Sequence, residues 1–250
     1  MKPAPFAWAS PASMMEATRV LSETDARAMA GGQSLGPMLN LRAARPATVV
    51  SLAGLAELHG AEDAADAITL GAATTHAAIA DGRTPDFAAP NPVLARIAAG
   101  IAYRAIRTRG TIGGSLCHAD PAADWLVTLT ALSATVLTTL RALPLDRFVI
   151  GPYRTALEPG EIVRAVRIPR PPAGARFGYH KLCRKPGEFA HAMAAVMIGD
   201  SLRISIGAVG GPPVVLSHPD QAAAALDFLD PVDRHMQIVA MRRALAEAGA

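Results

Sequence analysis

Residues 111–124 of the chain read TIGGSLCHADPAAD, and residues 30–35 read AGGQSL. Both stretches place a serine soon after two glycines, directly in the first case and one residue later in the second. Paired glycines allow a positive φ and let the backbone approach a ligand without a Cβ in the way. Successive amide groups in such a turn form a concave site for an anion, and the serine hydroxyl adds a further donor. The two stretches together predict a divided site for one anionic cofactor.

A single pair of glycines is also typical of an ordinary turn, so it is the repetition that favours a cofactor. Arg107 and Arg109 precede the second stretch, where they add positive potential near a pyrophosphate or are solvated loop charges. The chain contains neither GxGxxG after a strand nor GxxxxGK[ST], so neither a Rossmann pyrophosphate turn nor a P-loop is supported.

Asp120 and Pro121 predict the start of a helix over residues 122–132, with a capping carboxylate and proline at the first helical position. Asp124 then lies one turn inside this helix. Its carboxylate either accepts hydrogen bonds from a polyol chain or stabilises the helix dipole. Cys117 and His118 are adjacent, which suits neither a zinc site nor a nucleophile pair, and His118 is interpreted as a loop residue near the cofactor.

The rest of the pattern alternates strands and helices loosely, which predicts an α+β fold. Three prolines within residues 169–174 predict a linker, and hence a domain boundary near residue 172. A capping box at 13–16 predicts a helix, and further helices are expected over 75–81, 93–99, 221–229 and 232–248. Strands are expected over 27–30, 48–52, 68–73, 136–140, 161–168, 177–182, 190–198 and 202–209.

Composition predicts a neutral, cytoplasmic globular protein. Lys and Arg total 24 against 21 for Asp and Glu, a surplus too small to indicate nucleic-acid binding. The uncharged stretch over 125–140 is short and rich in Thr and Ser, so no transmembrane segment is expected. Two cysteines do not make a disulfide framework, and the N-terminus lacks the apolar core of a signal peptide.

Read together, these motifs resemble the FAD-binding medium subunit of the molybdenum hydroxylases, which include xanthine dehydrogenase and the aerobic carbon monoxide dehydrogenases. The resemblance runs through the whole chain, and its further motifs are Phe6 and Pro11, IRTRG at 106–110, HADPAAD at 118–124, LEPGEI at 157–162 and YxKxxR at 179–184. It implies an FAD-binding domain of the vanillyl-alcohol-oxidase (PCMH) type, built of two lobes, over residues 1–172. A small α+β C-terminal domain would follow at 173–250.

The resemblance implies FAD as the cofactor, with no catalytic residue and no metal site in this chain. The two glycine stretches would hold the pyrophosphate, Asp124 the ribityl or ribose hydroxyls, and Ile162 and Lys181 would lie near the flavin. The implied cofactor-binding residues are Ala30, Gly31, Gly32, Gln33, Ser34, Leu35, Ile101, Thr111, Ile112, Gly113, Gly114, Ser115, His118, Asp124, Ile162 and Lys181.

The implied function is electron transfer. The subunit would take electrons from an iron–sulfur small subunit, itself supplied by a large subunit with the molybdenum cofactor, and pass them to an external acceptor. The complex would be a dimer of heterotrimers. Two alternatives stay open: a free-standing FAD reductase or oxidase of the same fold, for which no catalytic base is evident, and a non-redox homologue that has lost FAD.

Three departures from the family pattern are visible. The family has a longer hairpin with a Gly-x-Arg turn between residues 135 and 148, of which only LRALP at 140–144 remains here. Glu188 stands where aspartate is usual, and the C-terminal domain is short. These differences bear on the C-terminal interface and the acceptor site more than on FAD binding.

Overall fold

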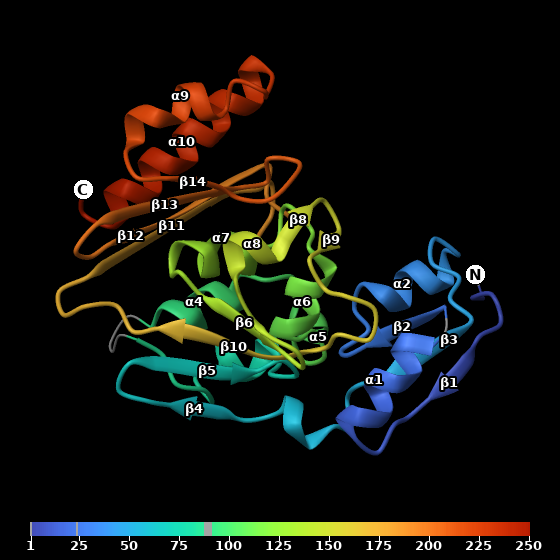
Figure 1. Cartoon of the computed structure of the whole chain (residues 1–250). Helices are drawn as coiled ribbons and strands as arrows, with labels where there is room; N and C mark the ends of the chain where they lie inside the picture. Colours follow the sequence, from blue (N-terminus) through green and yellow to red (C-terminus); the bar gives the residue numbers. More distant parts are fainter. Residues whose placement is uncertain (1, 24, 88–91) are drawn as a thin grey trace.

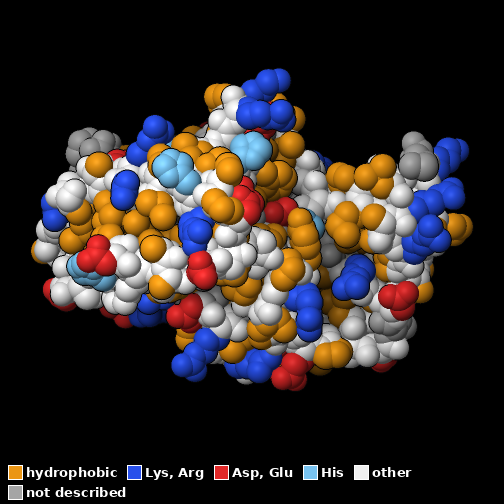
Figure 2. Space-filling view, turned by 90° about the horizontal axis from the view of Figure 1, so that it is seen from above, with side chains coloured by type: hydrophobic (Ala, Val, Ile, Leu, Met, Phe, Trp, Pro, Cys, Tyr) orange, Lys and Arg blue, Asp and Glu red, His pale blue; other side chains and the backbone are white. Residues whose placement is uncertain are grey.

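The computed structural model describes residues 2–23, 25–87 and 92–250. An N-terminal lobe lies at one side of a larger middle lobe, and a C-terminal sheet with its helices lies over the other side (Figure 1). Lys and Arg side chains gather at the outer end of the N-terminal lobe, on the right of the space-filling view (Figure 2). The mixture of helices and strands confirms the predicted α+β class.

The N-terminal lobe is a small parallel sheet covered by a helix. Its elements are β1 (Ala7–Ala9), α1 (Met14–Glu23), β2 (Ala26–Met29), α2 (Leu35–Asn40) and β3 (Thr48–Ser51). Strand β3 lies between β1 and β2 and is parallel to both. The predicted cap of α1 is present, because the Glu16 amide donates to Ser13 Oγ at 3.2 Å. The Glu16 carboxylate accepts from the amide of Ala12, not Ser13.

The middle lobe is an antiparallel sheet in the order β4-β5-β10-β6-β7, with helices α4, α6 and α7 over one face (Figure 1). Trp125 and Phe148 are fully buried in its core. Its elements are η1 (Ala56–Leu58), β4 (Ala61–Asp63), β5 (Ala67–Gly71), α3 (His76–Ala80), α4 (Val93–Ala99), α5 (Arg104–Arg107), α6 (Ile112–His118), α7 (Asp124–Ala131), β6 (Thr135–Thr138), β7 (Ala142–Pro144), α8 (Leu145–Phe148), β8 (Val149–Gly151), β9 (Arg154–Thr155) and β10 (Val163–Pro169).

The C-terminal part is an antiparallel sheet in the order β11-β12-β13-β14. Its elements are β11 (Arg176–Leu182), β12 (Ala192–Ile198), β13 (Leu202–Gly207), β14 (Val214–Leu216), η2 (Pro219–Gln221), α9 (Ala222–Ala225) and α10 (Pro231–Glu247). Alternate side chains of β12 point to opposite faces, as expected of a strand. Val196 packs with Met241 of α10, whereas Ala195 packs with Val127 and Ala131 of α7. Helix α7 therefore joins the middle lobe to the C-terminal sheet.

Two helix predictions were wrong in detail. Asp120 does not cap a helix that begins at Pro121, because its carboxylate accepts from the Ala122 amide and its carbonyl from the Ala123 amide, which closes a separate turn. Helix α7 begins only at Asp124, so Asp124 is its first residue and not one turn inside. The helix expected over 221–229 is limited to α9, whereas the one expected over 93–99 is confirmed.

The shortened hairpin between β6 and β7 is held by a buried carboxylate. The Glu161 side chain has no exposed surface, and Arg141 donates to both of its oxygens at 3.0 and 3.1 Å. Thr138 Oγ1 donates to the same carboxylate at 2.6 Å. Two-point pairing of arginine with a carboxylate is strong and directional. The hairpin is thereby fixed to the segment that enters β10.

Candidate functional site

The two glycine motifs meet in space. A Cβ added to Gly31 would lie 2.6 Å from the carbonyl carbon of Arg109 and closer still to its oxygen. A Cβ added to Gly114 would lie 3.9 Å from that of Ala30. Glycine at position 31 therefore allows the backbone of the first motif to touch the segment that leads into the second. The sequence-based expectation that both motifs serve one site requires this closeness.

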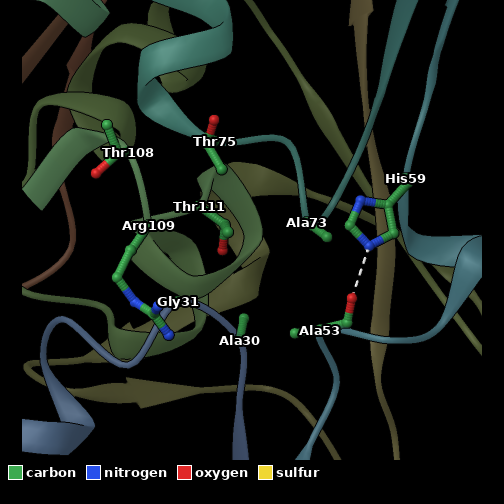
Figure 3. Close-up of a pocket in the computed structure, with 9 residues that line it drawn as sticks. All are labelled: Ala30, Gly31, Ala53, His59, Ala73, Thr75, Thr108, Arg109 and Thr111. Carbon is green, nitrogen blue, oxygen red and sulfur yellow. Dashed lines mark hydrogen bonds between the residues drawn. The ribbon is translucent and has the colours of Figure 1, made fainter.

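A pocket of about 210 Å³ lies where the motifs meet (Figure 3). Its walls come from the loop after β2, the segment between β3 and β4, the segment between β5 and α3, and the segment before α6. The lining residues are Ala30, Gly31, Ala53, His59, Ala73, Thr75, Thr108, Arg109 and Thr111. The His59 ring is fixed on one wall by a 3.0 Å hydrogen bond between Nε2 and the Ala53 carbonyl. The pocket thus combines hydroxyl groups and one arginine with small apolar side chains.

The first motif is an open loop between β2 and α2. Gly32 has a φ of +70°, which a residue with a side chain rarely adopts. The Gln33 side chain donates to the Gly31 carbonyl at 3.1 Å and stabilises the turn. Within the described part of the chain, the amide groups of Gly32, Gln33 and Ser34 donate no backbone hydrogen bond. Amides without a backbone acceptor are of the kind that an anion-binding turn offers.

The second motif is not an open loop but the first turn of α6. The amides of Ile112 and Gly113 donate to the carbonyls of Thr74 and Ala72, both at 3.0 Å. Thr111 caps the helix, because its side chain accepts from the Gly114 amide at 3.0 Å. The expectation of a second nest of free amides was therefore wrong. These hydrogen bonds instead hold α6 against the end of β5, and Thr111 remains on the pocket wall.

The two arginines before α6 have different roles. Arg109 lines the pocket and takes part in no ion pair of the described residues. Arg107 donates to the carbonyls of Ile101 and Ala102 at 2.9 and 2.8 Å. This supports a strained backbone, because Ala102 has a φ of +42°. Ile101 in turn pairs with Gly187, so Arg107 also supports contact with the C-terminal part.

Asp124 belongs to a cluster with two residues of β11. Lys181 Nζ lies 3.0 Å from Oδ1 and 3.1 Å from Oδ2 of Asp124, and the Tyr179 hydroxyl donates to Oδ1 at 2.6 Å. The side chains of Lys181 and Asp124 are only 11% and 7% exposed. Burial and the neighbouring carboxylate raise the pKa of Tyr179 well above its usual value, so its hydroxyl stays a donor.

Two further predicted residues lie apart from the pocket. His118 ends α6, so the interpretation as a loop residue was wrong, and its ring lies 5.2 Å from the ring of Tyr153. Ile162 is buried, and its amide donates to Thr139 Oγ1 at 3.2 Å, next to the β6–β7 hairpin. Tyr153 donates to Asp120 at 3.2 Å, which places the HADPAAD segment against the β8–β9 turn.

Comparisons with known proteins identify the family of the chain. Residues 4–171 match the family described as "FAD binding domain in molybdopterin dehydrogenase". The chain belongs to this family. It is an FAD-binding subunit of the molybdenum hydroxylase type, an oxidoreductase, which confirms the resemblance seen in the sequence motifs.

Two curated relatives and one solved structure illustrate the similarity. The nicotine 6-hydroxylase medium subunit of Paenarthrobacter nicotinovorans is 36% identical over 84% of this chain and 77% of its own length. The carbon monoxide dehydrogenase medium chain of Afipia carboxidovorans is 36% identical over 83% of this chain and 75% of its own length. A carbon monoxide dehydrogenase structure from Hydrogenophaga pseudoflava superposes with a TM-score of 0.89, at 29% identity over 100% of this chain and 99% of that chain. Among the described residues, no helix is long and apolar enough to cross a membrane.

Sequence reasoning missed several features of this FAD subunit. Tyr179 was recognised only as part of a motif, and its hydrogen bond to Asp124 was not foreseen. Thr75, Ala53 and His59 carry no motif that marks them as pocket residues. Thr75 was expected only as a helix cap, a role it has, since its side chain accepts from the Ala78 amide at 3.1 Å. It lines the pocket because it pairs with Thr111 in an isolated bridge.

His76 is buried directly after the pocket residue Thr75 and is expected to make stability depend on pH. Burial, together with the nearby charge of Arg107, lowers its pKa from 6.5 to about 4. Trp125 Nε1 donates to His76 Nδ1 at 3.1 Å, which fixes the neutral ring. Between pH 6.5 and 4 the unfolded chain therefore binds a proton that the folded chain does not. The free energy of unfolding should fall by about 3 kcal/mol as the pH drops through this window.

Urea unfolding at several pH values checks this prediction. A His76→Asn variant keeps an acceptor for Trp125 but does not titrate. It should be less stable than the wild type at pH 7 and should show a flatter pH dependence between pH 6.5 and 4. Equal pH slopes for the two proteins would show that His76 is not the group responsible.

Proposed function

We propose that this FAD subunit transfers electrons from an iron–sulfur subunit to an external acceptor. It would work within a cytoplasmic complex that also contains a molybdenum-cofactor subunit, assembled as a dimer of heterotrimers. The relatives named above are medium subunits or chains, which supports a role inside a larger assembly. The proposal also takes residues 1–172 as the FAD-binding domain and 173–250 as a separate C-terminal domain.

The observation that carries the proposal is the pocket between the two glycine motifs. Its residues fit an anionic pyrophosphate, because the unpaired amides of residues 32–34 lie in the motif that lines it, and Arg109 and Thr111 contribute to the same walls. Charge-assisted hydrogen bonds from arginine and backbone amides suit phosphate oxygens. FAD supplies the redox chemistry when bound, and the protein's part is to bind, orient and shield it.

The proposed cofactor-binding residues have different tasks. Those in the first motif, from Ala30 to Leu35, would donate amide hydrogen bonds to the pyrophosphate. Thr111 and Ser115 would add hydroxyls, while the residues between them hold α6 in place. Asp124 would accept from a ribityl or ribose hydroxyl. The residues proposed to lie around the flavin are Ile101, His118, Ile162 and Lys181.

Purification of the tagged chain from its own host tests the proposed complex. We expect iron, molybdenum and FAD to accompany the chain in fixed ratios through size-exclusion chromatography. Anaerobic addition of the substrate of the molybdenum subunit should then bleach the flavin absorbance near 450 nm. A chain that carries FAD but elutes alone, without iron or molybdenum, would contradict the electron-transfer proposal.

Arg109 offers a test of the pyrophosphate placement. Replacing Arg109 with glutamine removes one positive charge from the pocket wall and should weaken FAD binding about tenfold, because hydrogen bonds to charged groups contribute roughly 1.5–3 kcal/mol. The loss should shrink as salt concentration rises. Fluorescence titration of the apoprotein with FAD measures both effects.

Arg164→Gln is a matched control for this substitution. Arg164 is exposed on β10, outside the pocket, and its replacement causes the same change in net charge. Its dissociation constant for FAD should equal that of the wild type. Equal FAD affinities of the Arg109 and Arg164 variants would show that the pyrophosphate does not bind in this pocket.

A further inference from the structure

The carboxylate of Asp124 has most of its hydrogen-bonding capacity filled by β11. A carboxylate offers about four acceptor sites, two on each oxygen. Oδ1 accepts from the Tyr179 hydroxyl at 2.6 Å and from Lys181 Nζ at 3.0 Å, and Oδ2 accepts from Lys181 Nζ at 3.1 Å. No other described residue donates to this carboxylate. Oδ1 is therefore saturated, and one acceptor site remains on Oδ2.

The two donors reach Asp124 because of their register in the C-terminal sheet. Tyr179 is opposite Ala195 and Lys181 is opposite Met193 across the β11–β12 pair. Directly opposed residues of an antiparallel pair share a face of the sheet. Ala195 and Met193 pack with Val127 and Ala131 of α7, so this face is turned toward the helix that Asp124 begins.

We propose that Tyr179 is a positioning residue of the FAD site, which orients the carboxylate of Asp124 so that only Oδ2 is left to accept one cofactor hydroxyl. This inference rests on the proposed placement of Asp124 beside FAD. Lys181 contacts both oxygens of Asp124 at similar distances, so it does not distinguish between the two orientations in which Oδ1 and Oδ2 are exchanged. The short hydrogen bond from Tyr179 to one oxygen distinguishes the two orientations and immobilises the group before the cofactor binds.

The same hydrogen bond links cofactor binding to the C-terminal sheet. Asp124 and Tyr179 are 55 positions apart in sequence and lie in elements that form different parts of the molecule. Tyr179 can orient the Asp124 carboxylate only when the C-terminal sheet, which contains β11, is packed against α7. FAD affinity should therefore depend on Tyr179 through Asp124.

A double-mutant cycle on the full-length apoprotein tests this role. Tyr179→Phe keeps the ring and removes only the hydroxyl, and should weaken FAD binding about tenfold. Asp124→Asn removes the charge that accepts the cofactor hydroxyl and should weaken binding at least as much. Because Tyr179 acts through Asp124, adding Tyr179→Phe to Asp124→Asn should cause little further loss. Fluorescence titration with FAD gives the four dissociation constants.

A role of Tyr179 that is merely structural predicts a different result. Tyr179→Phe would then weaken FAD binding by the same factor in both backgrounds, and such additivity would overturn the proposal. Tyr103→Phe is the matched control: this residue is 64% exposed, and its hydroxyl has no hydrogen bond among the described residues. Urea unfolding of each apoprotein shows whether the variants fold.

The outcomes also separate this inference from the proposed function. A wild-type chain that binds no FAD would contradict FAD binding itself. If the wild type and the Asp124→Asn variant bind FAD equally tightly, Asp124 does not contact the cofactor. The positioning role of Tyr179 is then contradicted as well. If Asp124→Asn weakens binding but Tyr179→Phe does not, the cofactor site stands and the positioning role falls.

Discussion

A Gly31→Ala variant is expected to lose FAD and to be less stable than the wild type by about 3 kcal/mol. The added methyl group would overlap the carbonyl group of Arg109, at 2.6 Å from its carbon atom. Overpacking against atoms that do not move usually costs about 1–3 kcal/mol. Relief requires the two motifs to separate, which would open the pocket that they form. One methyl group should therefore affect both stability and cofactor binding.

The segment that contains Arg109 has no room to withdraw. The Gly110 amide donates to the Ile106 carbonyl at 2.8 Å, and the Gly110 carbonyl accepts from the His76 amide at 2.9 Å. A Cβ at Gly110 would lie 2.9 Å from Cδ2 of His76, so the ring is packed directly behind this segment. Because of these contacts, the clash at Gly31 must be relieved by movement of the first motif.

Gly36→Ala is the control for this prediction. Gly36 is the second residue of α2, and a Cβ added there would meet no atom within 4 Å. Alanine favours a helix over glycine by roughly 1 kcal/mol, so this variant should be at least as stable as the wild type and should keep FAD. FAD titration and urea unfolding compare the two variants. A Gly31→Ala chain with unchanged FAD affinity would show that contact between the motifs is not required.

The fold was predictable where local pattern determines it. The helix at Val93–Ala99 and the caps at Ser13 and Thr75 follow from residues within a few positions of each other. The start of α7 was misplaced because Asp120 and Pro121 fit a helix cap and a tight turn equally well by type. The structure has the turn, in which the Asp120 carboxylate and carbonyl accept hydrogen bonds from two successive amides.

The sequence indicated which residues are candidates for the site, but not what each of them does in the structure. Both glycine motifs place a serine after two glycines, yet only the first keeps free amides. In the second, the segment after β5 supplies carbonyls to Ile112 and Gly113, and this depends on tertiary packing. For Asp124, spacing suggested a polyol contact or a helix-dipole role. Its ion pair with Lys181 was hidden, since the two residues are 57 positions apart.

This ion pair gives the second large expected effect. Lys181→Met should lower the free energy of unfolding by about 3–5 kcal/mol, because it leaves the Asp124 carboxylate buried without its cation. Methionine preserves most of the length and apolar volume of the lysine side chain. Tyr179 still donates to Oδ1, but a neutral hydroxyl does not replace a charge. Urea unfolding of the apoprotein at pH 7 measures the loss independently of FAD.

A double variant identifies the unpaired charge as the cause. Adding Asp124→Asn to Lys181→Met removes the charge and should restore more than half of the lost stability. If the free energy of unfolding of Lys181→Met lies within about 0.5 kcal/mol of the wild-type value, solvent already stabilises the charge of Asp124 without Lys181.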